Sequence, residues 1–255
     1  MKQITMFSWG YYGWGNATTQ LVKAVDAAEI SRGFEPPIFV DIRIHRTVRA
    51  KGFQGNNFEK LLGSNRYRWM KSLGNKSVQT RTGKGIQIAK PSAAEELLDF
   101  AIESAVNNHR ILFFCSCPWP IACHRTKVAR LVLKATMKRA VPLEIVEWPG
   151  GKPVSIELEV NPEFFSAVRR GRMTIPLMGN ISLGQVACLP LGSIATLYSG
   201  HEKLHRIVGP AIWQKKQWIL PVLGFFDDPD IGLSDYKKKA DELRRGCGLL
   251  PISSR

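Results

Sequence analysis

Chemically reactive side chains are concentrated in one segment, Cys115-Ser116-Cys117-Pro118-Trp119-Pro120-Ile121-Ala122-Cys123-His124-Arg125. A buried strand over Arg110–Cys115 and an amphipathic helix over Arg125–Arg139 are expected on either side of it. Cys123 then lies at a helix N-terminus beside Arg125, where the helix dipole and the cation favour a thiolate. We predict Cys123 as a nucleophile, His124 as a proton-transfer group and Arg125 as an anion holder.

The same segment also allows a metal site. Thiolates and imidazole are the ligands that zinc and iron prefer, and the candidates are Cys115, Cys117, Cys123 and His124. Against this, Cys-x-Cys is a tighter spacing than zinc sites usually have, and the adjacent residues Cys123 and His124 rarely point to the same ion. A cysteine at a buried strand end is often only a small apolar side chain, which fits Cys115 best. The metal therefore stays an alternative.

Two other strand ends are expected to bring polar groups to the same place. A strand over Ile4–Trp9 leads into a glycine-rich turn, and a strand over Ile38–Ile42 carries Asp41 near its end, followed by Arg43. The carboxyl ends of parallel strands share one sheet edge, where ligands bind in open α/β sheets. We predict Asp41 as a general base or sugar anchor and Arg43 as an anion holder, with a salt bridge between them as the alternative. The predicted ligand-binding residues are Gly10, Tyr11, Gly13 and Cys115.

Strands that alternate with helices over residues 1–148 predict an α/β fold, with a Rossmann-like, mostly parallel sheet. One helix is expected to begin near Thr18, and another after Ser92, whose capping box would include Glu95. The 149–151 segment is a predicted linker to a smaller, β-rich, barrel-like domain over residues 152–255. The elements expected there are helices over 162–170 and 235–245 and strands over 185–189, 194–198, 205–208 and 217–222.

Positive charge is concentrated in the first part of the chain. The net charge of the whole protein is +15, and residues 43–90 contain twelve Lys and Arg but only one acidic residue, Glu59. Such a segment supports salt-sensitive binding of nucleic acid, and its aromatic residues could stack on unpaired bases. The alternative is a solvated basic surface with Phe53, Phe58, Tyr67 and Trp69 in the core. Short helical patches are expected at 58–62 and 66–73. The predicted nucleic-acid-binding residues are Arg46, Arg49, Lys51, Arg66, Arg68, Trp69 and Lys71.

The remaining composition predicts a cytoplasmic protein. No apolar run approaches the length of a membrane span, and the N-terminal residues lack the pattern of a secretory signal. Five cysteines, three of them within nine residues, suit a metal or reactive thiol in a reducing compartment better than a disulfide framework.

Three motifs together resemble the domain-of-unknown-function family 488. They are Ser8–Gly13, Val40–Arg43, and Cys115 with Cys123-His124-Arg125 eight positions later. The likeness covers residues 1 to about 148 and implies a Rossmann-like core. It implies one site formed by Gly10, Tyr11, Asp41, Arg43, Cys115, Cys123, His124 and Arg125. This chain has Cys117 where family members usually have an acidic residue, and Tyr12 where a glutamate or polar residue is common.

The C-terminal part resembles another group of domains more loosely. Asn161–Arg172 and Gly192–Tyr198 are similar to segments of PUA-like or ASCH barrels, which implies recognition of RNA or of a modified base. A purely structural barrel is the alternative, because fold-level analogy does not fix function.

These patterns favour an enzyme that modifies or hydrolyses nucleic acid, or acts on a modified nucleotide, in a pocket at the strand ends. The alternative is a non-catalytic module that binds nucleic acid or a modified base and holds zinc or iron at its Cys/His residues. A third interpretation is a small-molecule nucleotide enzyme whose surface charge is incidental.

Overall fold

The computed structural model describes residues 3–80, 85–117, 120, 122–178 and 181–225. The chain forms two compact units, with the boundary between Trp148 and Pro149. The helix expected over 235–245 and the end of the expected 152–255 domain lie outside the described residues.

The first unit is built on a five-stranded sheet with the order β3-β2-β4-β1-β5. Its strands are β1 (Ile4–Gly10), β2 (Glu35–Asp41), β3 (Tyr67–Trp69), β4 (His109–Cys115) and β5 (Leu143–Glu147). Every strand pairing in this sheet is parallel, so all the carboxyl ends fall along one edge. The predicted mixed α/β fold with a parallel sheet is confirmed.

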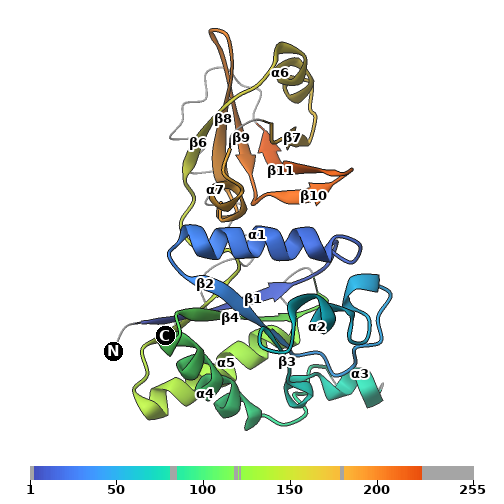
Figure 1. Cartoon of the computed structure of the whole chain (residues 1–255), viewed down its shortest axis with the longest axis vertical. Coiled ribbons are helices and arrows are strands. Elements are labelled where there is room, and N and C mark those ends of the chain that lie inside the picture. The colour runs from blue at the N-terminus through green and yellow to red at the C-terminus, as the bar shows by residue number, and fades with distance from the viewer. Residues whose placement is uncertain (1–2, 81–84, 118–119, 121, 179–180, 226–255) are drawn as a thin grey trace. The chain divides into compact units, whose positions relative to one another are not determined.

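Helices cover both faces of this sheet. α1 (Thr18–Ser31) lies on one face, and α4 (Ala93–Val106) and α5 (His124–Arg139) lie on the other (Figure 1). The central strands are therefore apolar on both sides, as in β4, where Ile111–Cys115 is completely buried. The connection after β1 runs towards β2, whereas the connection after β4 runs towards β5 on the other side of the sheet. The strand order thus reverses between β1 and β4, which is where ligands bind in such folds.

The basic segment wraps one end of the sheet and supplies its edge strand. It contains η1 (Lys51–Phe53), α2 (Asn57–Leu62), β3, η2 (Lys71–Leu73) and α3 (Lys76–Thr80). The helical patch expected at 58–62 is present as α2, whereas of the one expected at 66–73 only the end, η2, is helical. Tyr67–Trp69 instead pairs with Phe39–Asp41 of β2, so tertiary pairing overrides the local pattern.

The capping box expected at the start of α4 is also not formed. Ser92 has helical backbone angles, φ −63° and ψ −20°, and its side chain makes no capping hydrogen bond. A capping residue needs an extended backbone to direct its oxygen at the free N–H groups. Glu95 lies in the first turn, where it favours the helix through its charge.

The second unit contains a six-stranded sheet that curls into a half-barrel. The sheet order is β10-β11-β9-β8-β6, and β7 pairs with β11. The strands are β6 (Ser155–Glu159), β7 (Thr174–Pro176), β8 (Ser193–Ser199), β9 (Glu202–Val208), β10 (Ile212–Gln214) and β11 (Gln217–Phe225). Its core contains Leu158, Phe165, Leu197, Val208 and Leu220. A β-rich, barrel-like second domain is confirmed at this level.

Two short helices accompany the half-barrel. α6 (Pro162–Arg169) matches the expected helix, and its start is capped by Asn161, whose Oδ1 accepts from the N–H of Phe164 at 2.8 Å. The strand expected over 185–189 is wrong, because Leu183–Ala187 is the helix α7. Val186 and Leu189 are both buried in the core, a three-residue spacing that suits a helical turn better than a strand.

Gly10 determines how closely β1 approaches the loop after β4. A Cβ at this position would lie 1.7 Å from the carbonyl oxygen of Cys117. We expect Gly10→Ala to lower the free energy of unfolding by about 1–3 kcal/mol or more, because the backbone must move to relieve the overlap. Urea denaturation measures the loss. Gly209→Ala is the control, since its Cβ would meet only side-chain atoms, at 3.2 Å and beyond; equal losses in both variants would contradict the prediction.

Candidate functional site

Three cysteines meet at the carboxyl ends of β4 and β1. Cys115 ends β4 and Cys123 is the residue before α5, and their sulfur atoms lie 3.1 Å apart. The backbone N–H of Cys117 lies 3.4 Å from the Cys115 sulfur. Cys115 and Cys123 are buried, whereas Cys117 is half-buried. The loop that was predicted to join a strand to a helix therefore folds its thiols into one cluster.

The guanidinium of Arg125 lies inside this cluster, and its side chain is 0% exposed. Its Nη1 is 3.5 Å from the sulfurs of Cys115 and Cys123 and donates to the Cys117 carbonyl oxygen at 2.7 Å. Its Nη2 forms an ion pair with Glu147 at 2.9 Å. A buried guanidinium needs such partners, because an unpaired charge in the interior is very costly. Arg125 thus holds the loop against the end of β5.

The cluster favours one thiolate, and that thiolate is at Cys117. The thiols of Cys115 and Cys123 donate to it, and together with the charge of Arg125 they lower the pKa of Cys117 to about 3, against the effect of burial. The pKa of Cys115 is raised, first by its hydrogen bonds to Cys117 and Cys123 and then by burial. Cys123, the predicted nucleophile, is only 2% exposed. The sulfur that combines exposure with a lowered pKa is Cys117.

Glu147 and Ser8 complete the surroundings of Arg125. The Ser8 hydroxyl donates to Glu147 Oε2 at 2.5 Å, and burial raises the pKa of Glu147. Neither residue was among the predicted site residues. Glu147 ends β5, so its place at the same sheet edge as Cys115 is the signal that could have identified it.

His124 connects the thiol cluster to the end of β2. Its Nε2 lies 3.0 Å from the carbonyl oxygen of Ile42, and its Nδ1 lies 4.0 Å from the Cys123 sulfur. A carbonyl oxygen only accepts hydrogen bonds, so Nε2 carries a proton and Nδ1 of the neutral ring has its lone pair towards Cys123. The ligand atoms of Cys115, Cys123 and His124 all lie within 4.8 Å of one another, an arrangement that could hold a metal ion. Adjacent residues rarely point to the same ion, but the ligand atoms of Cys123 and His124 belong to one group here.

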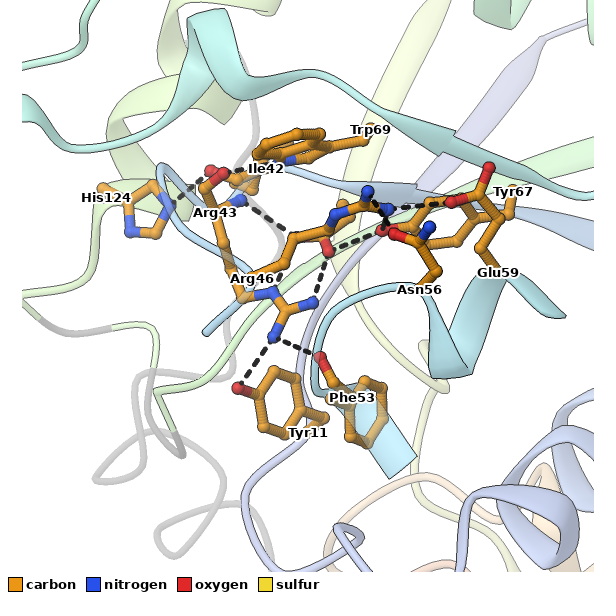
Figure 2. A network of polar contacts seen from close by, with 11 residues as sticks. Tyr11, Ile42, Arg43, Arg46, Phe53, Asn56, Glu59, Tyr67, Trp69 and His124 are labelled. Carbon is orange, nitrogen blue, oxygen red and sulfur yellow. Dashed lines mark hydrogen bonds and ion pairs between the residues drawn. The ribbon is translucent and has the colours of Figure 1, made fainter. Parts of the chain in front are cut away.

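Asp41 and Arg43 form a second buried network beside this loop. Arg43 donates to Asp41 from its backbone N–H at 3.0 Å, from Nε at 2.8 Å and from Nη2 at 2.5 Å. Its Nη1 donates to the hydroxyl of Tyr11 at 3.2 Å and to the carbonyl of Phe53 at 3.0 Å (Figure 2). The Tyr67 hydroxyl donates at 2.7 Å to Asp41 Oδ2, the oxygen that Arg43 Nη2 also contacts. The salt bridge considered as the alternative for this pair is present.

The electrostatics of this network keep Asp41 and Arg43 paired. Burial opposes the charge of Arg43, but the hydrogen bonds and charge of Asp41 outweigh it and raise the pKa of the guanidinium. Burial, followed by the charge of Asp41, raises the pKa of Tyr67, and burial also raises the pKa of Tyr11. Both tyrosines therefore stay protonated and donate or accept as neutral hydroxyls. Asp41 is 0% exposed, so this geometry suits positioning better than proton abstraction from a ligand.

The predicted ligand-binding residues have different surroundings. Gly10 lies against the Cys117 carbonyl, and Cys115 belongs to the thiol cluster. The ring of Tyr11 is buried and stacks on Phe53, with the ring centroids 3.9 Å apart. Gly13 has φ +87° and is exposed, and a Cβ there would touch nothing within 4 Å. The structure thus brings Gly10 and Cys115 to the thiols, and Tyr11 to Arg43.

The predicted nucleic-acid-binding residues divide into two groups. Arg46 forms an ion pair with Glu59 at 2.8 Å, and Arg66 forms one with Asp26 of α1 at 2.5 Å, so these two cations are engaged within the fold. Of the aromatic residues considered for base stacking, Phe53, Phe58 and Tyr67 are in the core. The exposed members of the set are Arg49, Lys51, Arg68, Trp69 and Lys71.

No protein-family model matches the chain, and no curated protein or solved structure is significantly similar to it. The resemblance of residues 1–148 to family 488 therefore stays a prediction. Among the residues that the structure describes, no helix has the length and apolar character needed to cross a membrane.

The Asp41 carboxylate is predicted to be essential for the stability of the first unit. Asp41→Asn leaves Arg43 buried beside a neutral amide, so we expect the free energy of unfolding to fall by about 3–5 kcal/mol. The control is Asp99→Asn, because Asp99 pairs with Arg139 at the exposed surface and its loss should cost less than about 1 kcal/mol. Urea denaturation followed by circular dichroism compares the two variants. Similar losses in both variants would show that the buried pair contributes no more to the free energy of unfolding than an exposed pair.

Cys117 is predicted to stay reactive at acidic pH. An ordinary thiol loses reactivity about tenfold per pH unit below its pKa, because only the thiolate attacks. Since the pKa of Cys117 lies at about 3, its alkylation rate by iodoacetamide should be nearly constant from pH 8 down to pH 5. Mass spectrometry of proteolytic peptides locates the modified cysteine. A rate at Cys117 that falls steeply below pH 8 would contradict the assignment of the thiolate.

Proposed function

We propose that the first unit acts on nucleic acid, with the thiolate of Cys117 as its reactive group. The observation that carries the proposal is the shared backbone anchor of the two predicted regions. The carbonyl of Ile42 accepts from His124 in the thiol loop, and the next carbonyl, that of Arg43, accepts from Trp69 Nε1 in the basic segment at 2.8 Å (Figure 2). A polymer bound on the basic segment would therefore lie next to the elements that hold the reactive loop.

In this proposal, the exposed cations of the basic segment bind phosphates. Arg49, Lys51, Arg68 and Lys71 are exposed. Arg43 and Arg125 were expected to hold an anion, but their guanidinium groups are buried and bind Asp41 and Glu147. We assign them to positioning: Arg125 stabilises the thiolate, and Arg43 fixes the strand end.

A thiolate of this kind is suited to nucleophilic attack. A sulfur is reactive when it is ionised at neutral pH and reachable, and Cys117 meets both conditions better than its two neighbours. His124 Nδ1 offers a lone pair beside the cluster and is the candidate for proton transfer. The substrate class proposed is a nucleic acid or a modified nucleotide within it.

A second candidate function is a non-catalytic module that holds zinc or iron. It is favoured by the grouping of Cys115, Cys123 and His124, and by the bond from His124 Nε2 to a carbonyl, which is how metal-binding histidines are commonly oriented. The position of Arg125 weighs against it. Its Nη1, 3.5 Å from both ligand sulfurs, already supplies the positive charge that a divalent ion would bring.

Salt dependence tests the polymer part of the proposal. If Arg49, Lys51, Arg68 and Lys71 each contact a phosphate, the logarithm of the binding constant for a single-stranded oligonucleotide should fall with the logarithm of salt concentration with a slope of about −3. Lys71→Ala should reduce this slope by about 0.7. Lys134→Ala, at an exposed lysine of α5, should leave the slope unchanged. Binding that does not weaken with salt would exclude the polymer.

Cys117→Ser tests the chemical part. This variant should bind oligonucleotides like the unmodified protein but form none of the product that mass spectrometry detects after incubation with nucleic acid. Protein purified without chelators provides the other arm, through elemental analysis for zinc and iron. If the protein contains stoichiometric metal, and the Cys115→Ser variant does not, the metal-binding module is the correct function and the nucleophile is not.

A further inference from the structure

The edge strand β3 presents a tryptophan that the fold does not bury. Trp69 is 37% exposed, although the other aromatic residues considered in the same segment, Phe53, Phe58 and Tyr67, are in the core. Large aromatic side chains normally contribute to stability through burial. An indole left at the surface of the most basic segment is therefore available to bind a ligand.

The orientation of this indole is fixed in advance. Its Nε1 donates to the carbonyl oxygen of Arg43 at 2.8 Å, and Arg43 is itself held by three bonds to Asp41. The guanidinium of Arg46 lies 4.3 Å from the centroid of the indole and is held by Glu59 and Asn56. A ring held in this way loses little conformational freedom when something stacks on it, which favours binding.

The charges around Trp69 indicate what kind of ligand stacks there. Lys71 Nζ lies 5.9 Å from the ring centroid, and the guanidinium of Arg46 lies over the same ring. The whole segment 43–90 has a single acidic residue, Glu59, and that residue is paired with Arg46. An aromatic face surrounded by cations complements a flat base attached to a phosphate chain. In a duplex the bases are already stacked on each other, so the suitable ligand is a single strand.

We propose that Trp69 is a stacking platform for an unpaired base of single-stranded nucleic acid, with Lys71 beside the adjacent phosphate. This inference rests on the proposed function and specifies its substrate as a strand with at least one unpaired base. It also assigns the recognition to the base ring rather than to base edges, because stacking on an indole tolerates every base.

The experiment compares a labelled twelve-residue oligothymidine with an abasic strand of the same length and with a duplex, by fluorescence anisotropy. Stacking predicts that Trp69→Ala weakens binding of oligothymidine by about 5- to 150-fold. The abasic strand should bind the unmodified protein that much more weakly, and Trp69→Ala should not weaken it further. Duplex binding should be the same for both proteins.

Two further variants separate stacking from a change in structure. Trp69→Phe keeps an aromatic face but loses the bond to Arg43, and it should retain most of the affinity for oligothymidine. Leu61→Ala removes a side chain of similar exposure, 40%, from the same basic segment and should change nothing. Thermal unfolding of each variant shows whether the fold is intact, and an oligouridine strand shows whether RNA binds as DNA does.

The outcomes distinguish this inference from the proposed function. Salt-dependent binding of oligothymidine that is equal for the unmodified protein and a folded Trp69→Ala variant would overturn the platform but leave the nucleic-acid function standing. Equal affinity for the abasic strand would do the same. Absence of binding to all four nucleic acids would overturn both proposals, and an affinity only for the duplex would overturn the single-strand assignment.

Discussion

The first unit depends on the pairing of two opposite charges that are taken out of water together at the end of β2. A buried arginine is tolerable only when its donors are satisfied, and Arg43 achieves this with a carboxylate, a tyrosine hydroxyl and a backbone carbonyl. These partners come from β2, from the turn after β1 and from η1. The hydrogen bonds of Arg43 therefore hold these three segments together at the edge of the sheet.

The same requirement shapes the neighbouring loop. Arg125 is as completely enclosed as the aliphatic core, and its partners are sulfurs, a carbonyl and a carboxylate from β4, the loop and β5. Because the two guanidinium groups lie beside adjacent strand ends, the clustered thiols and the basic segment share a common rigid support. Rigid support of this kind is what a site needs to hold reacting groups in position.

The sequence predicts the parallel sheet well, because its central strands are apolar on both faces and its helices have clear periodicity. It also places Cys115, Asp41 and Gly10 correctly at one edge, since carboxyl ends of parallel strands must meet.

The sequence does not predict which of three thiols is ionised, because that depends on distances between side chains eight residues apart. Nor does it separate Arg66, paired with Asp26, from the exposed Arg68, because both have the same local pattern and differ only in tertiary partners. The short strands β3, β7 and β10 are missed for a similar reason: three residues carry too little periodicity, and only their neighbours make them strands.

Arg125 is one cation with two kinds of acid competing for it. Glu147 holds one of its nitrogens and the sulfurs approach another, and burial already shifts the carboxyl group towards its protonated form. A proton that binds to Glu147 would remove the negative charge that competes for Arg125, so the charge of Arg125 would favour the Cys117 thiolate more strongly. The carboxyl group of Glu147 therefore competes with the thiols for the positive charge of Arg125. Replacing Glu147 by glutamine would favour the thiolate although no cysteine is changed.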